Sequence, residues 1–112
     1  MTSEVLRKEF VDSATLHHLA IEAGDSTTAN KIHKKLMLLY NEVKKRNSQE
    51  CFVAFLDNQN EGVRLWSATF LLKTHSDLAI EALKELKNLR GITSIDAKLV
   101  LTLWEQGKLE LL

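Results

Sequence analysis

Proline is absent from this 112-residue sequence, and glycine occurs only four times. Tight turns between β-strands draw heavily on both residue types, so their shortage argues against a fold rich in sheet. Helices joined by short polar links need neither residue type. The sequence therefore predicts an all-α protein.

Cysteine and long apolar runs are also scarce. The one cysteine, Cys51, lies in the apolar run 51–53, which excludes a disulfide framework and is typical of a buried thiol in a reducing compartment. The first ten residues contain no apolar segment of the kind found in signal peptides, and no run approaches the ~20 apolar residues that cross a bilayer. We expect a cytoplasmic protein with no membrane contact.

The sequence also has no net charge, because 15 basic residues balance 15 acidic ones. The whole molecule then has no electric field that would draw it onto nucleic acid. Hydrophobic residues make up 45% of the chain, which is enough for one core at this length. Residues 1–112 are therefore expected to form a single domain.

The spacing of the apolar residues predicts six helices. Their approximate ranges are 3–23, 26–46, 49–56, 61–73, 77–90 and 94–106. Gly24, Gly91 and Gly107 follow predicted helix ends, where a left-handed residue is common. Polar residues suited to N-caps precede three of the helices: Asp25 or Ser26, Ser76 or Asp77, and Thr93 or Ser94.

The apolar positions also indicate which side of each helix faces the core. The helix at 61–73 has two apolar stripes, which predicts a central position between neighbours with Ala68 buried. In the first helix, Leu16 and Leu19 widen the apolar stripe, and in the last helix Ile95 and Leu99 repeat at every fourth residue. The leucines expected to fold back onto this core at the end of the chain are Leu109, Leu111 and Leu112.

Short links between the helices predict three antiparallel pairs that stack side by side. Val63-Arg64 and Ala97-Lys98 open the second helices of the last two pairs and are 34 residues apart, a separation typical of helical repeats. Four residues after each pair comes a small side chain, Ala68 in one helix and Thr102 in the other.

The segment Phe55-Leu56-Asp57, followed by Gly62-Val63-Arg64 and then Ala68 and Leu72, resembles the HEAT-repeat signature. More widely, residues 5–109 are similar to a family of short, uncharacterised bacterial HEAT-like proteins. The matching pieces are Gly24-Asp25, Val63-Arg64-Leu65-Trp66 with Ala68, and Trp104-Glu105-Gln106-Gly107-Lys108-Leu109. The turn at 58–60 departs from the usual HEAT pattern because it has no proline.

The resemblance implies a right-handed stack of helix pairs, and it assigns no activity. It also implies that Arg64 pairs with Asp57 and holds the turn between two helices. A direct contact between Arg64 and a partner is the alternative.

Side chains that could support catalysis or hold a metal are few. His17, His18 and Glu22 lie close together on one predicted helix, but a zinc site needs three or four ligands, and no HExxH pattern completes the set. Glu81 and Glu85 alternate with lysines, as on a solvated helix face. A Gly-x-Ser-x-Gly elbow and a glycine-rich phosphate loop are both lacking. We predict a protein that is not an enzyme and has no cofactor or metal.

Charge is unevenly distributed along the first two predicted helices. Residues 1–25 contain five acidic and two basic residues, a net charge of −3, and residues 26–46 contain one acidic and six basic residues, a net charge of +5. The ordinary interpretation is a solvated hairpin in which the charges partly cancel. The functional interpretation is a dipolar surface for a charged partner.

These features predict a non-catalytic module that binds another protein one to one. An immunity protein that covers the active site of a toxin, for example a nuclease, is one such module, and acidic groups would then mimic nucleic acid. Binding of nucleic acid through the basic segment from Lys31 to Arg46 is the alternative. The residues predicted to contact a partner are Glu4, Glu9, Asp12, Glu22, Asp25, Arg64 and Lys98. Those predicted to be structural are Asp57, Arg64 and Ala68.

Overall fold

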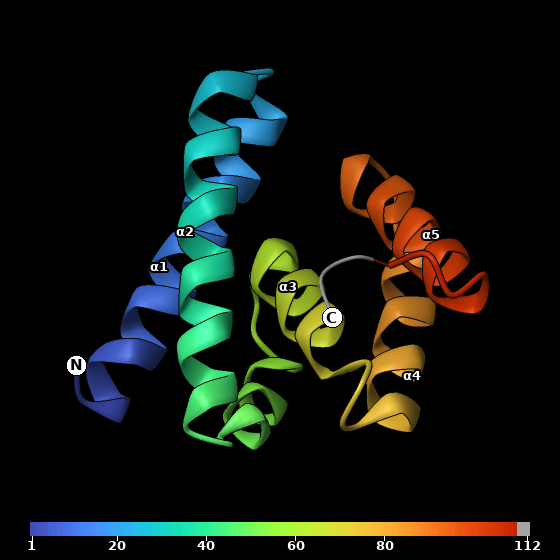
Figure 1. The fold of residues 1–112 in the computed structure, drawn as a ribbon. Helices are drawn as coiled ribbons and strands as arrows, with labels where there is room; N and C mark the ends of the chain where they lie inside the picture. Colours follow the sequence, from blue (N-terminus) through green and yellow to red (C-terminus); the bar gives the residue numbers. More distant parts are fainter. Residues whose placement is uncertain (110–112) are drawn as a thin grey trace.

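The computed structural model of the chain describes residues 1–109, and every regular element in this range is a helix (Figure 1). In chain order they are α1 (Ser3–Glu22), α2 (Ser26–Lys45), the 3₁₀ helix η1 (Gln49–Phe55), α3 (Glu61–Leu71), α4 (Ser76–Lys87) and α5 (Ile92–Glu105). The predicted all-α fold with six helical segments is confirmed. Within residues 1–109, no helix is long and apolar enough to span a membrane.

Helices that are consecutive in the sequence pack against each other. α1 and α2 form an antiparallel hairpin, η1 packs on α3, and α4 packs on α5 (Figure 1). α3 also contacts α1, α4 and α5, so it joins the hairpin to the other end of the molecule. Leu109 packs against the core as predicted, whereas Leu111 and Leu112 lie outside the described residues.

α3 is the central and most buried helix, as predicted. Its buried residues are Gly62, Val63, Trp66, Ser67, Ala68, Thr69, Phe70 and Leu71. The Phe70 ring stacks on Tyr40 of α2, with the ring centroids 4.4 Å apart, and it also contacts Phe10 of α1 at 5.9 Å. These aromatic rings join α3 to both helices of the hairpin.

α1 and α3 approach each other closely at Gly62. A Cβ atom at this position would lie 2.5 Å from the Cβ of His18 and 2.8 Å from the carbonyl oxygen of Ala14. Glycine therefore sets the distance between the two helices.

Short polar side chains explain where the first α-helices begin. Thr2, Asp25 and Asn60 precede α1, α2 and α3, and the side chain of each accepts a hydrogen bond from a backbone N–H in the first turn. The predicted cap Asp25 is thereby confirmed.

The predicted caps of the last two helices are wrong. α4 follows His75 and α5 follows Gly91, and neither residue caps its helix through a side chain. Gly91 has a φ of 98°, so the chain reverses in a left-handed conformation and enters α5 before Thr93. Ser94 lies inside α5 and donates a hydrogen bond from its hydroxyl to the Lys87 carbonyl oxygen at 2.6 Å.

Two predicted core faces point to solvent instead. Leu16 and Leu19 of α1 are exposed, and Ile95 and Leu99 of α5 are 65% and 55% exposed. α5 is buried through its other side, which carries Ala97. Because apolar residues occur on both sides of α5, periodicity alone could not identify the side that its neighbours cover.

Candidate interaction surface

The outer face of α2 combines lysines with one exposed leucine. The buried side of the helix follows the helical period and consists of Ala29, Leu36, Leu39, Tyr40 and Val43. Leu38 lies on the opposite side and is 69% exposed, the largest value among the exposed large hydrophobic residues. Its neighbours three, four or seven residues away share this side because of the helical repeat. Glu42 also lies on this side, where it pairs with Arg46. We call the other residues of this side the α2 basic face: Lys31, Lys34, Lys35, Leu38, Asn41 and Lys45.

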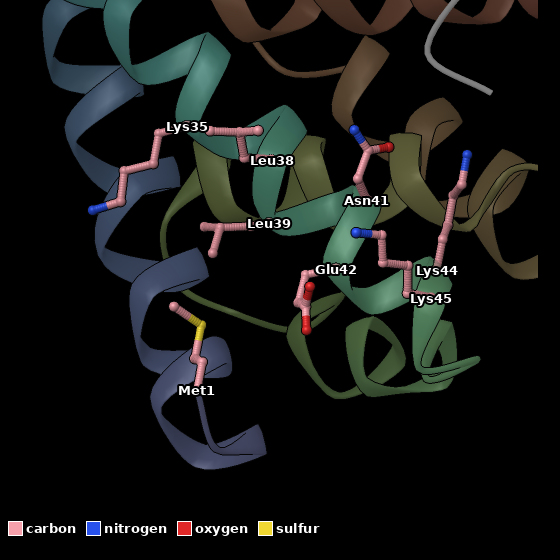
Figure 2. Close-up of a pocket in the computed structure, with 8 residues that line it drawn as sticks. All are labelled: Met1, Lys35, Leu38, Leu39, Asn41, Glu42, Lys44 and Lys45. Atoms are coloured by element: carbon pink, nitrogen blue, oxygen red, sulfur yellow. The ribbon is translucent and has the colours of Figure 1, made fainter.

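A groove of about 980 Å³ runs along this face (Figure 2). Its lining residues are Met1, Lys35, Leu38, Leu39, Asn41, Glu42, Lys44 and Lys45. Arg46 fixes one end of the groove, because its Nη2 donates to the Met1 carbonyl oxygen and its Nε donates to Glu42 Oε1 at 3.0 Å. Met1 is thereby held beside Leu39, and the residue is 67% exposed.

Much of the positive charge on this face is not cancelled within the chain. Lys35 forms an ion pair of 2.6 Å with Glu9 of α1. Lys31, Lys34 and Lys45 have no carboxylate oxygen within 4.0 Å among residues 1–109, and all three are exposed. Lys31 is nevertheless near enough to Asp25 to help lower the pKa of that carboxyl. Unpaired lysines around an exposed leucine suit an acidic protein surface that has an apolar recess.

Most of the acidic side chains predicted to contact a partner already have partners within the chain. Besides Glu9, Asp12 of α1 pairs with Lys8 at 3.3 Å, and Glu22 Oε1 lies 3.1 Å from His18 Nε2. Exposed pairs of this kind are weak, so they lower the local charge without fixing the side chains rigidly.

Asp25 has a structural role, because its carboxylate accepts hydrogen bonds from the N–H and the hydroxyl of Thr28 at 3.1 and 2.6 Å. These hydrogen bonds lower the pKa of Asp25. Glu4 is exposed near the start of α1, about 27 Å along the helix axis from Glu22. The structure therefore does not gather the acidic residues into one patch.

The predicted ion pair between Arg64 and Asp57 is not formed in the part of the chain that the structure describes. Two asparagines hold the turn instead. Asn58 Oδ1 accepts a hydrogen bond from the N–H of Asn60 at 2.8 Å, and Asn60 Oδ1 accepts from the N–H of Val63 at 3.1 Å. Asparagine side chains stabilise such turns without a charge, so this turn does not need the Asp–Arg pair of the HEAT pattern.

Lys98 lies on a different surface from the other predicted contacts. It lines a groove of about 380 Å³ between α4 and α5, together with Lys84 and Lys87. α4 and α5 lie across α3 from the hairpin of α1 and α2 (Figure 1). The predicted partner-binding residues thus occupy separate parts of the molecule.

A cluster that sequence reasoning missed joins α1, α2 and α3 at His17, His33 and Trp66. Trp66 Nε1–H donates to His17 Nδ1 at 3.4 Å, and the indole ring meets the imidazoles of His17 and His33 edge-on at 5.2 and 5.3 Å. Burial lowers the pKa of His17, and the nearby His33 and His18 lower it further. The sequence signal for this cluster was the position of His33, which lies one helical turn after the buried Ala29 and therefore near the covered side of α2.

Cys51 and the metal-binding residue types offer little chemistry. Cys51 is half-buried, and burial raises the pKa of its thiol, which lowers the fraction of reactive thiolate. Residues 1–109 contain no group of three or more His, Cys, Asp or Glu side chains that could hold a metal ion. That the protein is not an enzyme stays a prediction.

The all-α fold of this chain has a counterpart among solved bacterial structures. That counterpart is the crystal structure of the protein RPA1889 from Rhodopseudomonas palustris CGA009, with a TM-score of 0.90. The sequences are 20% identical, and the match covers 98% of this chain and 93% of the other. The likeness establishes the fold alone. No protein-family model and no curated protein sequence matches the chain.

Proposed function

We propose that this chain is a non-catalytic module that binds one protein partner through the α2 basic face. The proposal rests on the exposure of Leu38, which is 69% exposed and is surrounded by lysines. Single exposed leucines are common on protein surfaces, but Leu38 lines the same groove as the exposed Met1. An apolar centre with a polar rim is the usual arrangement of a protein interface.

The support behind α2 favours binding with little rearrangement. Leu36, Tyr40 and Val43 are at most 2% exposed, so the inner side of α2 is fixed by the core. Because the helix is already formed, a partner would not have to order it on binding.

We further propose that the partner is a toxin and that the chain acts as an immunity protein by covering it. Such a protein needs only a complementary shape and charge. The unpaired lysines favour an acidic surface on the toxin. Mimicry of nucleic acid by α1 has less support, because Glu9, Asp12 and Asp25 are already engaged within the chain.

A HEAT-like relationship is part of this proposal. The consecutive helix pairs support it, and Val63 and Ala97, which are 34 residues apart, are both fully buried. The next pair of equivalent residues differs, since Ala68 is buried and Thr102 is exposed. α5 has no following helix among the described residues to cover that position.

The test uses the protein encoded beside this chain as the candidate toxin. We expect a one-to-one complex, and we expect co-expression to restore the growth of cells that the partner inhibits. Leu38→Glu should weaken the complex by about tenfold or more, because burial of a leucine contributes roughly 1.5–3 kcal/mol. Binding is measured by calorimetry, and protection is measured by growth.

Leu16→Glu is the matched control, because Leu16 is a similarly exposed leucine on α1. It should leave both measurements unchanged. Equal losses in the two variants would remove the α2 basic face from the proposal. Failure to bind at micromolar concentration would exclude that partner, and tight, salt-sensitive binding of DNA would favour the nucleic-acid alternative.

A further inference from the structure

Arg64 is a half-buried arginine whose guanidinium has no hydrogen bond or ion pair with the described residues. Its Nε atom is enclosed and has no hydrogen-bonding partner. The ion pairs of residues 1–109 do not include Arg64. Arginine cannot lose its proton at ordinary pH, so its charge stays while its enclosed N–H lacks an acceptor. Such groups are rare in folded proteins and call for an explanation.

The position of Arg64 on α3 restricts how the side chain can move. Arg64 precedes the fully buried residues Ala68 and Leu71 by four and seven residues, so its aliphatic stem leaves the helix beside the core. Its two Nη groups are not among the enclosed atoms, so solvent can reach them. The guanidinium is therefore anchored by its stem, with its outer edge accessible.

No acidic side chain of residues 1–109 forms an ion pair with this group. Asp57 and Glu61 are the acidic residues nearest in sequence, and both lie more than 4.0 Å from the guanidinium. Because the two accessible Nη groups form a fork of parallel N–H donors at the outer edge of the guanidinium, the matching acceptor is a carboxylate with two oxygens. The N-terminal turn of α3 adds a favourable partial positive charge.

We propose that Arg64 is the receptor of a carboxylate-binding site at the N-terminal turn of α3. The ligand is a carboxylate rather than a phosphate, because one arginine with Glu61 in the same turn favours a single negative charge over a double one. The carboxylate comes either from a small acid or from an acidic side chain of another protein. The site is independent of the α2 basic face.

The side-chain Nε–H signals of the arginines respond to binding at the Nη groups of the same guanidinium, so they provide a test by nuclear magnetic resonance. The wild-type chain is titrated with sodium acetate, with an amidated tripeptide that contains one glutamate, and with inorganic phosphate, at constant ionic strength kept by sodium chloride. We expect a saturable shift of the Arg64 signal with acetate or the peptide. Tighter binding of the peptide than of acetate would assign the site to a partner's side chain, and equal binding would assign it to a small acid.

Two other arginines are internal controls. Arg46 Nε already donates to Glu42, so its signal should not move, and Arg90 is exposed, so its response reports non-specific ion binding. Arg64→Lys keeps the charge and removes the fork, and it should abolish the extra thermal stabilisation of the chain by acetate. No saturable shift at Arg64, a response equal to that of Arg90, or stronger binding of phosphate would each overturn the proposal.

Discussion

Asp96 is a half-buried carboxyl on α5 whose pKa is raised because burial disfavours its charged form, although His18 offsets part of this effect. The folded chain therefore holds this proton more tightly than the unfolded chain does. The resulting stabilisation is complete below the unfolded pKa of 3.8 and is lost as the pH rises through the higher pKa of the folded state. At neutral pH, a charged and partly buried Asp96 thus opposes folding.

Asp96→Asn should accordingly raise the midpoint of thermal unfolding at neutral pH. The difference from the wild type should shrink as the solution is acidified, because the aspartate then becomes neutral as well. Scanning calorimetry across this pH range measures both effects. Asp77→Asn is the control, since Asp77 is exposed in the first turn of α4. A lower midpoint in Asp96→Asn would mean that the carboxylate has a favourable partner in solution.

At the scale of the helices, the sequence predicted where elements lie better than which side they bury. The N-caps of α2 and α3 depend on neighbours in the chain, and Asp25 was identified from its position alone. The covered side of α5 depends on which helices pack against it, and this information is not local. η1 adopts 3₁₀ geometry, which is frequent in short connecting segments.

The candidate surface likewise has some features that local sequence predicts and others that depend on how the helices pack. Its basic character can be predicted from the net charge of residues 26–46. The exposure of Leu38 can also be predicted, because this residue lies outside the regular spacing of the buried residues of α2. The ion pair between Lys35 and Glu9 joins residues on two helices, so its formation depends on how they pack. The predicted pair of Arg64 and Asp57 was wrong because two asparagines hold that turn.

The crossing of α1 and α3 provides a test of packing at Gly62. Gly62→Ala should destabilise the fold by about 1–3 kcal/mol, because the added methyl group would meet the backbone oxygen of Ala14 as well as His18. Unfolding in urea measures the loss. Gly24→Ala is an informative comparison, since nothing lies within 4 Å of a Cβ there and only its φ of 71° opposes the change. An unchanged stability of Gly62→Ala would show that the two helices can separate without cost.

The junction of α1, α2 and α3 should be sensitive to acid through His17. Because burial lowers the pKa of His17 in the folded state, the unfolded chain binds the proton first as the pH falls. The stabilisation is therefore present above the unfolded pKa of 6.5 and is lost progressively below it. Protonation of Nδ1 would also remove the acceptor of the Trp66 hydrogen bond.

His17→Gln should flatten the fall in stability between neutral and mildly acidic pH, and it should change the fluorescence of Trp66. His33, His18 and Asp96 are the other titratable groups near this junction, so the comparison is made with His75→Gln, which lies outside it. Stability profiles of the same slope in His17→Gln and the wild type would contradict the role of His17.

At the scale of the whole molecule, a net charge of zero conceals local fields. The α2 basic face and the groove that contains Lys84, Lys87 and Lys98 lie in different parts of the fold. Each can attract an acidic surface at distances comparable to the Debye length of about 10 Å at 0.1 M salt, although the chain as a whole migrates as a neutral particle. Salt dependence of binding therefore reports more about this protein than its isoelectric point does.

The lysines around Leu38 have a second consequence, for behaviour at high protein concentration. Burial of an exposed leucine is favourable, so a second copy of the same chain could bind over Leu38 and cover it. Two α2 basic faces brought together would place unpaired lysines against one another, and this repulsion opposes the contact. Salt weakens the repulsion and leaves the apolar attraction in place. The ionic strength of the solution should therefore set how far this protein remains a monomer, with dilute salt as the condition that keeps Leu38 free.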